Sequence, residues 1–260
     1  MQSLKLIIAA LTAMAISGCS MSGDDKIRDF ENLSDKTIAV QEGTTFEAIF
    51  AEKYPSYNVI KVPTAFDIYK AIVSGKAEYG IDDDVSAVLM LAGGLSIDTA
   101  NANMPAVPMG AVFNKKNTEL QAQFNDFITE LEQSGQLAEI RNKWFCTSSP
   151  SSLPVPKPQV TEGEPLNIVT EGDYPPFNLS IGGIVSGLDA ELWTLFADKI
   201  GRPVKITVIP FSDIIPCIAE GKADMALSGI SITEERAKKV LFSKPYNNTY
   251  TIIVSSKRIK

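Results

Sequence analysis

Histidine is absent from the 260 residues, and cysteine occurs only three times. The lack of histidine excludes Ser-His-Asp and Cys-His catalysis and histidine-ligated metals. No Cys-x-x-Cys spacing occurs, which excludes a cysteine-only zinc site, so no metal or other cofactor is expected. Basic residues are in deficit, because 24 Lys and Arg stand against 31 Asp and Glu, a net charge of −7. This deficit disfavours nucleic acid as a partner.

Long apolar runs are also missing, since a membrane span needs about 20 apolar residues. A run of eleven, Leu6 to Ile16, follows Lys5 and suits the core of a signal peptide. It leads into Ser17-Gly18-Cys19, which resembles the bacterial lipobox, where the cysteine is lipidated. The sequence predicts a signal peptide over 1–18, lipidation of Cys19 and a polar tether over 19–31. An ordinary export signal is the alternative.

Two further cysteines, Cys146 and Cys217, remain in the exported part of the chain. An exported protein lies in a compartment that permits disulfides. The two residues can pair or can stay free and buried, because the sequence gives no distance between them.

The chain contains a diverged internal repeat. Residues 38–43 (IAVQEG) and 168–172 (IVTEG) each predict a short buried strand that ends in a glycine turn. Helices are predicted from Phe66 and from Phe211, and each closes at a glycine that an apolar strand follows, in GKAE (75–78) and GKAD (221–224). Strand–helix–strand order with short connections predicts parallel α/β units in two similar lobes. Chance similarity between common patterns is the alternative.

A proline- and serine-rich stretch over 147–163 predicts an extended linker between the lobes. Before it, residues 117–145 predict two helices that Gly135 separates. The first helix carries one apolar face, made of Leu120, Phe124, Phe127, Ile128 and Leu131.

Two stretches resemble a known family, the family 3 extracellular solute-binding proteins, which are polar amino-acid binders of ABC importers. The stretch from Leu166 to Val254 is similar to the family's first lobe through GDYPPF (172–177), GLD (187–189), Phe211, SGISITEER (228–236) and FSKPY (242–246). The stretch from Leu33 to Phe145 is similar to the second lobe and C-terminal helices through VQEGTT (40–45), DDD (82–84) and KWF (143–145).

The resemblance implies an α/β, two-lobed periplasmic-binding-protein type II fold (Venus flytrap), here with its lobes in circularly permuted order. Joining Ser256 to Asn32 would restore the family order. One crossing between lobes is expected near Ala111 to Asn114, and strand Thr251 to Val254 is expected in the hinge. The predicted parts are 32–112, a second-lobe-like domain; 113–146, a hinge strand and helices packing on the other lobe; 147–163, a linker; and 164–260, a first-lobe-like domain. The alternative is a fragment of a tandem array whose lobes pair between chains, although the initial Met and the signal favour a complete protein.

A free amino acid carries a carboxylate and an ammonium, and burial of either needs a charged partner. Arg236 can clamp the carboxylate in a bidentate manner, within the first turn of a helix capped by Thr233. The family resemblance gives Ser228, Gly229 and Ser231 as its helpers. A surface Arg236 paired with Glu234 or Glu235 is the alternative.

The other predicted contacts also follow from the resemblance. Asp83 matches the ammonium acceptor, unless the 82–84 acids are a solvated strand end. Thr44 and Thr45 can add contacts to the carboxylate. Tyr174 and Phe211 match the aromatic walls, with plain core as the alternative. Glu171 matches a position near the ligand's distal group and favours a cationic or amide side chain, unless it serves only its own lobe.

The predicted function is a lipid-anchored, monomeric receptor that captures a free polar amino acid by hinge closure and delivers it to an ABC permease. It would face the periplasm or the cell exterior and catalyse no reaction. One alternative is an enzyme on the same fold, like a cyclohexadienyl dehydratase, with Glu171 or Asp83 as general acid. Another is a sensory module of a signalling system.

Overall fold

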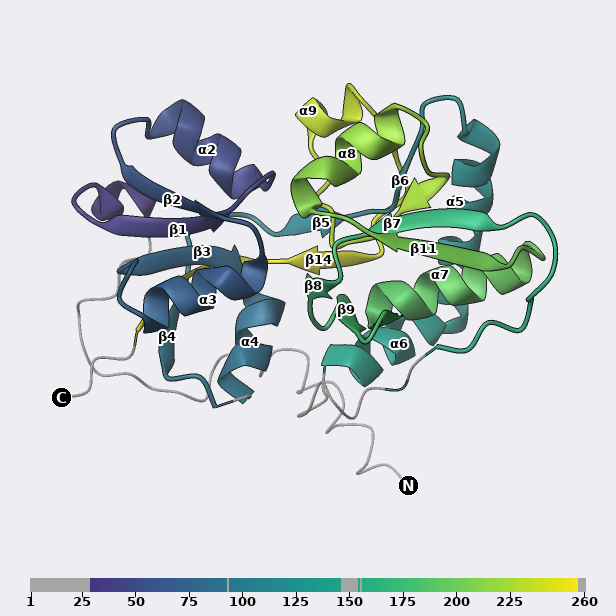
Figure 1. Cartoon of the computed structure of the whole chain (residues 1–260), viewed down its shortest axis with the longest axis horizontal. Helices are drawn as coiled ribbons and strands as arrows, with labels where there is room; N and C mark the ends of the chain where they lie inside the picture. The colour runs from purple at the N-terminus through teal and green to yellow at the C-terminus, as the bar shows by residue number, and fades with distance from the viewer. Residues whose placement is uncertain (1–28, 93, 146–153, 155, 257–260) are drawn as a thin grey trace.

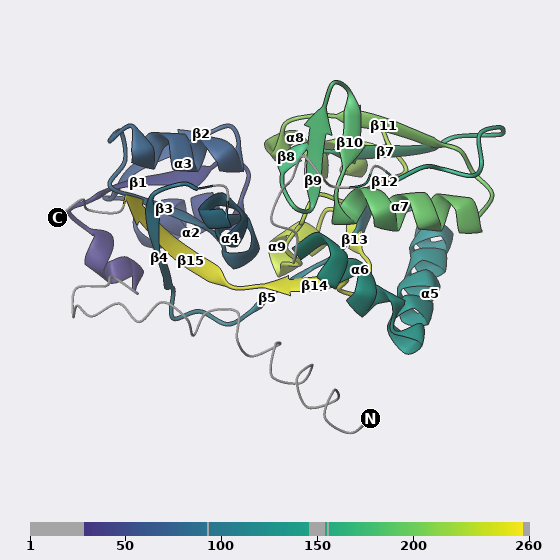
Figure 2. The same cartoon turned by 90° about the horizontal axis from the view of Figure 1, so that it is seen from below.

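The computed structural model describes residues 29–92, 94–145, 154 and 156–256. The predicted signal peptide, Cys19 and Cys146 lie outside these residues, so lipidation and the pairing of Cys146 with Cys217 stay predictions. The described chain forms two α/β lobes, side by side and joined by two strands (Figures 1 and 2). Lobe 1 comprises the described residues within 29–101 and 251–256, and lobe 2 comprises those within 110–246. Within this described part, no helix has the length and apolar character to cross a membrane.

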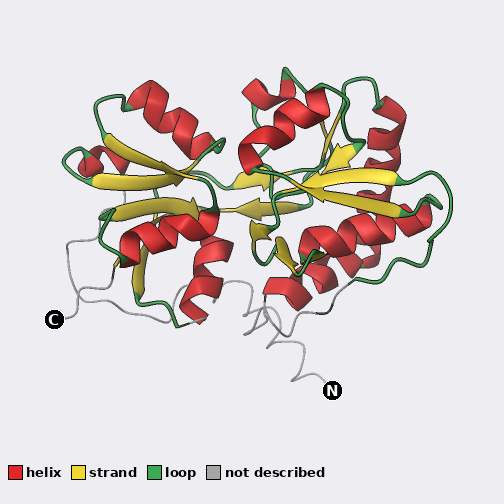
Figure 3. Ribbon diagram, viewed as in Figure 1, coloured by secondary structure: helices red, strands yellow, loops and turns green. Residues whose placement is uncertain are grey.

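Lobe 1 is built on a five-stranded sheet of order β2-β1-β3-β15-β4. β1, β2 and β3 are parallel, whereas β15 runs antiparallel to both of its neighbours. Helices cover both faces of the sheet (Figure 3). The elements of lobe 1 are η1 (Phe30–Leu33), β1 (Thr37–Gln41), α2 (Thr45–Lys53), β2 (Asn58–Val62), α3 (Ala65–Val73), β3 (Tyr79–Asp83), α4 (Asp84–Ala92), β4 (Ile97–Asn101) and β15 (Thr251–Ser256).

Lobe 2 repeats this plan with the order β11-β7-β12-β6-β13. Its first three strands are parallel, and β6 is antiparallel to both neighbours. A small hairpin sheet, β10-β9-β8, is added. The elements are β6 (Val112–Phe113), α5 (Thr118–Ser134), α6 (Gln136–Phe145), β7 (Leu166–Thr170), β8 (Asp173–Tyr174), β9 (Asn178–Ile181), β10 (Ile184–Ser186), α7 (Leu188–Lys199), β11 (Val204–Val208), α8 (Phe211–Ala219), β12 (Met225–Ala226), α9 (Glu234–Ala237) and β13 (Leu241–Phe242).

The repeated helix-to-strand turns explain the matching topology. α3 and α8 are each followed within two residues by a glycine in the left-handed region, Gly75 at φ 74° and Gly221 at φ 74°. This backbone conformation is costly for residues with a Cβ atom, so glycine ends the helix and turns the chain into the next parallel strand. The strands β3 and β12 then pair with β1 and β7 in the same way.

The hinge lies at two strands that the sequence does not single out. β5 (Val107–Met109) pairs antiparallel with β14 (Asn247–Thr249) between the lobes. The crossing therefore precedes the expected Ala111 to Asn114, because β6 already belongs to the lobe 2 sheet. The expected hinge strand, Thr251 to Val254, instead lies inside the lobe 1 sheet. Its apolar side chains pack on both faces, with Ile252 and Ile253 in different core clusters.

The segment before β7 follows the surface of lobe 2. The Asp198 carboxylate of α7 accepts hydrogen bonds from the amides of Gln159 (2.8 Å) and Val160 (3.0 Å). The helices that precede this segment, α5 and α6, also pack on lobe 2, where the rings of Phe124 and Phe196 meet edge to face at 5.0 Å. The connection from α6 to β7 thus begins and ends on the same lobe.

Candidate functional site

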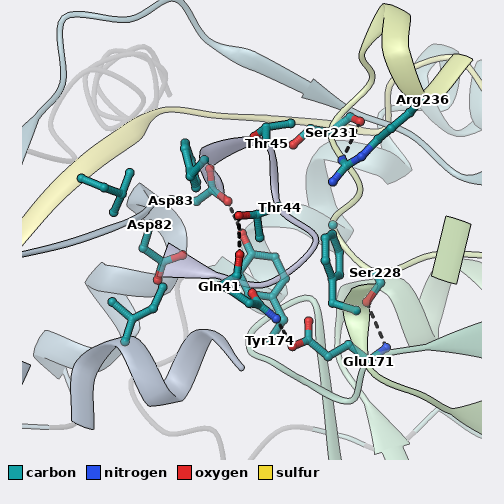
Figure 4. Close-up of a pocket in the computed structure, with 15 residues that line it drawn as sticks. Gln41, Thr44, Thr45, Asp82, Asp83, Glu171, Tyr174, Ser228, Ser231 and Arg236 are labelled. Atoms are coloured by element: carbon teal, nitrogen blue, oxygen red, sulfur yellow. Dashed lines mark hydrogen bonds between the residues drawn. The ribbon is translucent and has the colours of Figure 1, made fainter. Parts of the chain in front are cut away.

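The cleft lies where both sheets present the carboxyl ends of their parallel strands. β1 and β3 end at Gln41 and Asp83, and Glu171 follows the end of β7. Open α/β sheets bind ligands at such strand ends. Side chains from both lobes converge there on one cavity (Figure 4). All ten predicted site residues line it: Thr44, Thr45, Asp83, Glu171, Tyr174, Phe211, Ser228, Gly229, Ser231 and Arg236.

Arg236 is held on the lobe 2 side by the short helix α9. The hydroxyl of Thr233 caps this helix by accepting a hydrogen bond from the Arg236 amide at 3.2 Å. The guanidinium donates through Nη1 to the carbonyl of Ser231 (3.0 Å) and through Nη2 to the carbonyl of Gly43 in lobe 1 (2.9 Å). It also lies 5.5 Å from the centre of the Phe211 ring. Burial lowers the pKa of Arg236 to about 10, so the group stays cationic at neutral pH.

Asp83 occupies the facing side, at the last position of β3. Its carboxylate accepts hydrogen bonds from the Tyr174 hydroxyl (2.6 Å) and from the Thr249 hydroxyl (3.0 Å). Burial raises the pKa of Asp83 to about 6, against the lowering effect of these two bonds. The bond from Tyr174 crosses the cleft, since Tyr174 belongs to lobe 2 and Asp83 to lobe 1.

A third bond across the cleft, after those of Arg236 and Tyr174, joins equivalent positions of the repeat. The Gln41 side-chain amide, at the end of β1, donates to the Glu171 carboxyl, which follows β7. Glu171 is buried, and this burial raises its pKa to about 8. The Glu171 amide donates to the Ser228 hydroxyl at 3.0 Å, which fixes the loop in lobe 2.

Two of the predicted hydroxyl contacts serve the protein itself. Thr44 caps α2 by accepting a hydrogen bond from the Glu47 amide, and its hydroxyl donates to the Gln41 carbonyl at 2.7 Å. The Ser228 hydroxyl is similarly engaged by the Glu171 amide. Both residues therefore shape the cavity wall with hydroxyls that are already paired.

The aromatic wall depends on a glycine. Tyr174 stacks on Phe177 with ring centres 5.0 Å apart. A Cβ atom at Gly229 would lie 2.4 Å from the Tyr174 ring, so only glycine lets the ring pack there. Phe211, the first residue of α8, also lines the cavity and lies next to Arg236.

Sequence reasoning missed three polar groups at the site. Gln41 could have been found, because it occupies the repeat position equivalent to Glu171. Asp82 lines the cavity, accepts a hydrogen bond from Tyr69 at 2.6 Å, and has its pKa raised by burial to about 7. Thr249 reaches Asp83 from the hinge strand, and no sequence motif signals that contact.

The remaining space is small, about 30 Å³. That volume holds only about two or three water molecules. Hydrogen bonds between the lobes, from Tyr174 to Asp83, from Gln41 to Glu171 and from Arg236 to Gly43, cross this cavity.

Two α/β lobes joined by two strands, with charged groups facing each other across the cleft, define a two-lobed protein of the periplasmic-binding-protein type. Residues 23–147 and 166–259 match the model of the bacterial extracellular solute-binding proteins, family 3. The chain belongs to this family.

Individual relatives match over shorter stretches. The arginine-binding extracellular protein ArtP of Bacillus subtilis is 35% identical over 88 residues, 34% of each chain. A cyclohexadienyl dehydratase of Pseudomonas aeruginosa is 34% identical over 91 residues, 34% of this chain and 33% of that protein. A solved ancestral arginine-binding protein bound to arginine is 36% identical, covering 30% of this chain and 34% of that one, with a TM-score of 0.29. The chain thus spans about a third of the length of these relatives.

Proposed function

We propose that the protein captures a free amino acid between its lobes and passes it to an ABC importer without catalysing a reaction. The observation that carries this proposal is the pair Arg236 and Asp83, which face one cavity from opposite lobes. A cation and a carboxylate in this arrangement complement the carboxylate and ammonium of an amino acid. Closure of the lobes would pair both ligand charges at once.

The cavity favours a cationic or amide ligand side chain. Asp82, Asp83 and Glu171 line it together with one cation, Arg236. Burial holds Glu171 and Asp82 close to their neutral forms, and a ligand with an additional positive charge would favour their ionised forms and pair with them. Relatives named as arginine-binding proteins support the same class.

A thermal-shift screen against the twenty amino acids tests the ligand assignment. A ligand that binds only the folded state raises stability by RT ln(1 + [L]/Kd). We expect arginine, lysine or glutamine to give the largest shift. A screen in which no amino acid raises the melting temperature would reject the proposed function.

We further propose that the chain is a circular permutant of the family order. Support comes from the family match, which falls in two segments on either side of residues 148–165, and from Gln159 and Val160, which bond to α7 of lobe 2. The test is a reordered gene that joins Ser256 to Asn32 and opens the chain within 147–163. Equal ligand affinity and melting temperature are expected for both orders, and a reordered chain that does not fold would contradict the proposal.

Lipid anchoring through Cys19 is proposed from the lipobox-like signal alone. The Cys19→Ala protein should be released from membranes or left unprocessed, because several acyl chains on one residue anchor firmly. Membrane fractionation checks this, and an unchanged distribution of the Cys19→Ala protein between fractions would contradict lipid anchoring.

A second candidate function is dehydration of a cyclohexadienyl compound. The relative from Pseudomonas aeruginosa has this name. Glu171 also meets one requirement of a general acid, since its pKa of about 8 keeps it protonated at neutral pH. Turnover of prephenate or arogenate by the purified protein distinguishes an enzyme from a binding protein.

A further inference from the structure

One close approach of the two lobes is made by backbone. Gly43, in the turn between β1 and α2, faces Ser212 in the first turn of α8. A Cβ atom at Gly43 would lie 2.5 Å from the Ser212 Cα and 3.0 Å from its nitrogen. Backbone atoms cannot rotate away as a flexible side chain can, so any residue other than glycine would push the lobes apart.

The turn that carries Gly43 is firmly held. The Gly43 amide donates to the Glu47 carboxylate at 2.6 Å, and that carboxylate also pairs with Lys61 at 2.7 Å. Gly43 has a φ of 76°, and the Thr44 cap follows it directly. These contacts hold the turn in the position where its backbone meets the other lobe.

The Gly43 carbonyl completes the contact. It accepts the hydrogen bond from Arg236 Nη2, while Nη1 stays on the Ser231 carbonyl of its own lobe. Arg236 retains further N–H groups for a ligand carboxylate, since a guanidinium has five. The same arginine can therefore bind a ligand and the opposite lobe together.

We propose that Gly43 determines whether the lobes can close. Because Gly43 has no Cβ atom, its Cα can lie against Ser212, and its carbonyl then accepts the hydrogen bond from Arg236. The glycine in the turn after β7 of lobe 2, Gly172, does not have this role, because a Cβ atom there would meet Val208 and Ser180 of its own lobe. The inference rests on the binding function proposed above, and it concerns lobe movement rather than the identity of the ligand.

The test compares Gly43→Asn with Gly75→Asn. Both glycines belong to lobe 1 and have nearly the same φ, 76° and 74°, but a Cβ atom at Gly75 meets nothing within 4 Å. Asparagine tolerates left-handed backbone better than most residues. Both variants should fold, which circular dichroism checks, and only Gly43→Asn should obstruct closure.

Closure of the lobes can be measured without a ligand, by the rate at which two introduced cysteines form a disulfide between the lobes. Thr64 immediately precedes α3 of lobe 1, and α3 contacts β8 of lobe 2, whose first residue is Asp173. Cysteines at positions 64 and 173 are therefore the trap for closed lobes. The background has its native cysteines replaced by serine. We expect Gly43→Asn to slow disulfide formation by at least about tenfold and Gly75→Asn to leave the rate within about twofold of the background.

Equal trapping rates for Gly43→Asn and the background would overturn the proposal, as would equal slowing by both substitutions or no trapping in the background. The affinity for L-arginine provides a second arm, and its Kd should rise at least about tenfold in Gly43→Asn alone. If L-arginine binds none of the proteins, the proposed ligand class is wrong, while the trapping result still decides the role of Gly43.

Discussion

The sheets of the two lobes have the same plan of strand directions, but different parts of the chain supply their strands. Lobe 2 is built from a continuous stretch, residues 110–246, whereas lobe 1 combines residues 29–101 with the distant strand β15. In each lobe the antiparallel fourth strand follows a crossing of the hinge, β15 after β14 and β6 after β5. The plan of a lobe is therefore independent of which part of the chain supplies its strands.

The largest expected effect comes from substitutions in the two hydrophobic cores, because each lobe has its own core. Phe50 lies in the lobe 1 core and Phe124 in the lobe 2 core, and both are fully buried. Truncating either phenylalanine to alanine should cost about 3–5 kcal/mol of unfolding free energy. Urea unfolding should show two transitions, with Phe50→Ala lowering one and Phe124→Ala the other. If each variant lowers both transitions equally, the lobes unfold as one unit.

The charged groups of the cleft give the next largest effect. Arg236→Ala removes the cation of lobe 2, and Asp83→Ala removes the carboxylate of lobe 1. Each change leaves one ligand charge buried without a partner, which should weaken amino-acid binding by about 2–5 kcal/mol. Calorimetric titration checks this, with Glu235→Ala as control because Glu235 is exposed and bonds only to Lys238 among the described residues. An Arg236→Ala affinity within about threefold of the original would refute the assigned site.

A smaller effect on stability comes from Glu171, which bonds across the cleft to Gln41, the equivalent residue of the other lobe. The pKa of Glu171 is about 8 in the folded protein and about 4.3 in an unfolded chain. At pH values between about 4.3 and 8, the Glu171 carboxyl is protonated in the folded state but ionised in the unfolded state. The unfolding free energy therefore falls as pH rises. We expect a loss of roughly 1–3 kcal/mol between pH 5 and 8.

Chemical denaturation at both pH values measures that loss. Glu171→Gln should flatten this part of the profile. The exchanged pair, Gln41→Glu with Glu171→Gln, should restore the slope, because the acid then lies in the same buried bond from the other lobe. A profile that Glu171→Gln leaves unchanged would assign the slope to other acids.

The smallest effect concerns the segment before β7. Asp198→Ala removes the acceptor for the amides of Gln159 and Val160. Loss of these bonds should lower only the lobe 2 transition, by about 1 kcal/mol. Ligand affinity should not change. An effect on the lobe 1 transition would show that the segment also supports the other lobe.

Much of the fold could be predicted because the repeat has strong local signals. The glycines at 75, 135 and 221 adopt left-handed backbone and mark helix ends, which a sequence shows directly. The hinge could not be placed in this way. A β-branched apolar run such as Thr251 to Val254 is equally typical of a hinge strand and of a sheet interior, and only its partners β3 and β4 decide between them.

The candidate site shows the same division. Ten of the residues that line the cavity were expected from strand ends, a capped helix and motif similarity. Gln41 and Thr249 were missed, because their importance lies in a bond to the other lobe or from the hinge. Contacts between lobes depend on the closing geometry, to which no local pattern in the chain corresponds.

The position of β15 reverses the order in which the lobes can be completed during synthesis. Chains are made from the N-terminus, and domains generally fold as units once their residues are available. All strands of lobe 2 have been synthesised by residue 242. Lobe 1 starts earlier in the chain, but it lacks its internal strand β15 until residue 256. Until then, β3 and β4 have an unfilled place between them. The part of the protein that leaves the ribosome first is thus the last that can fold.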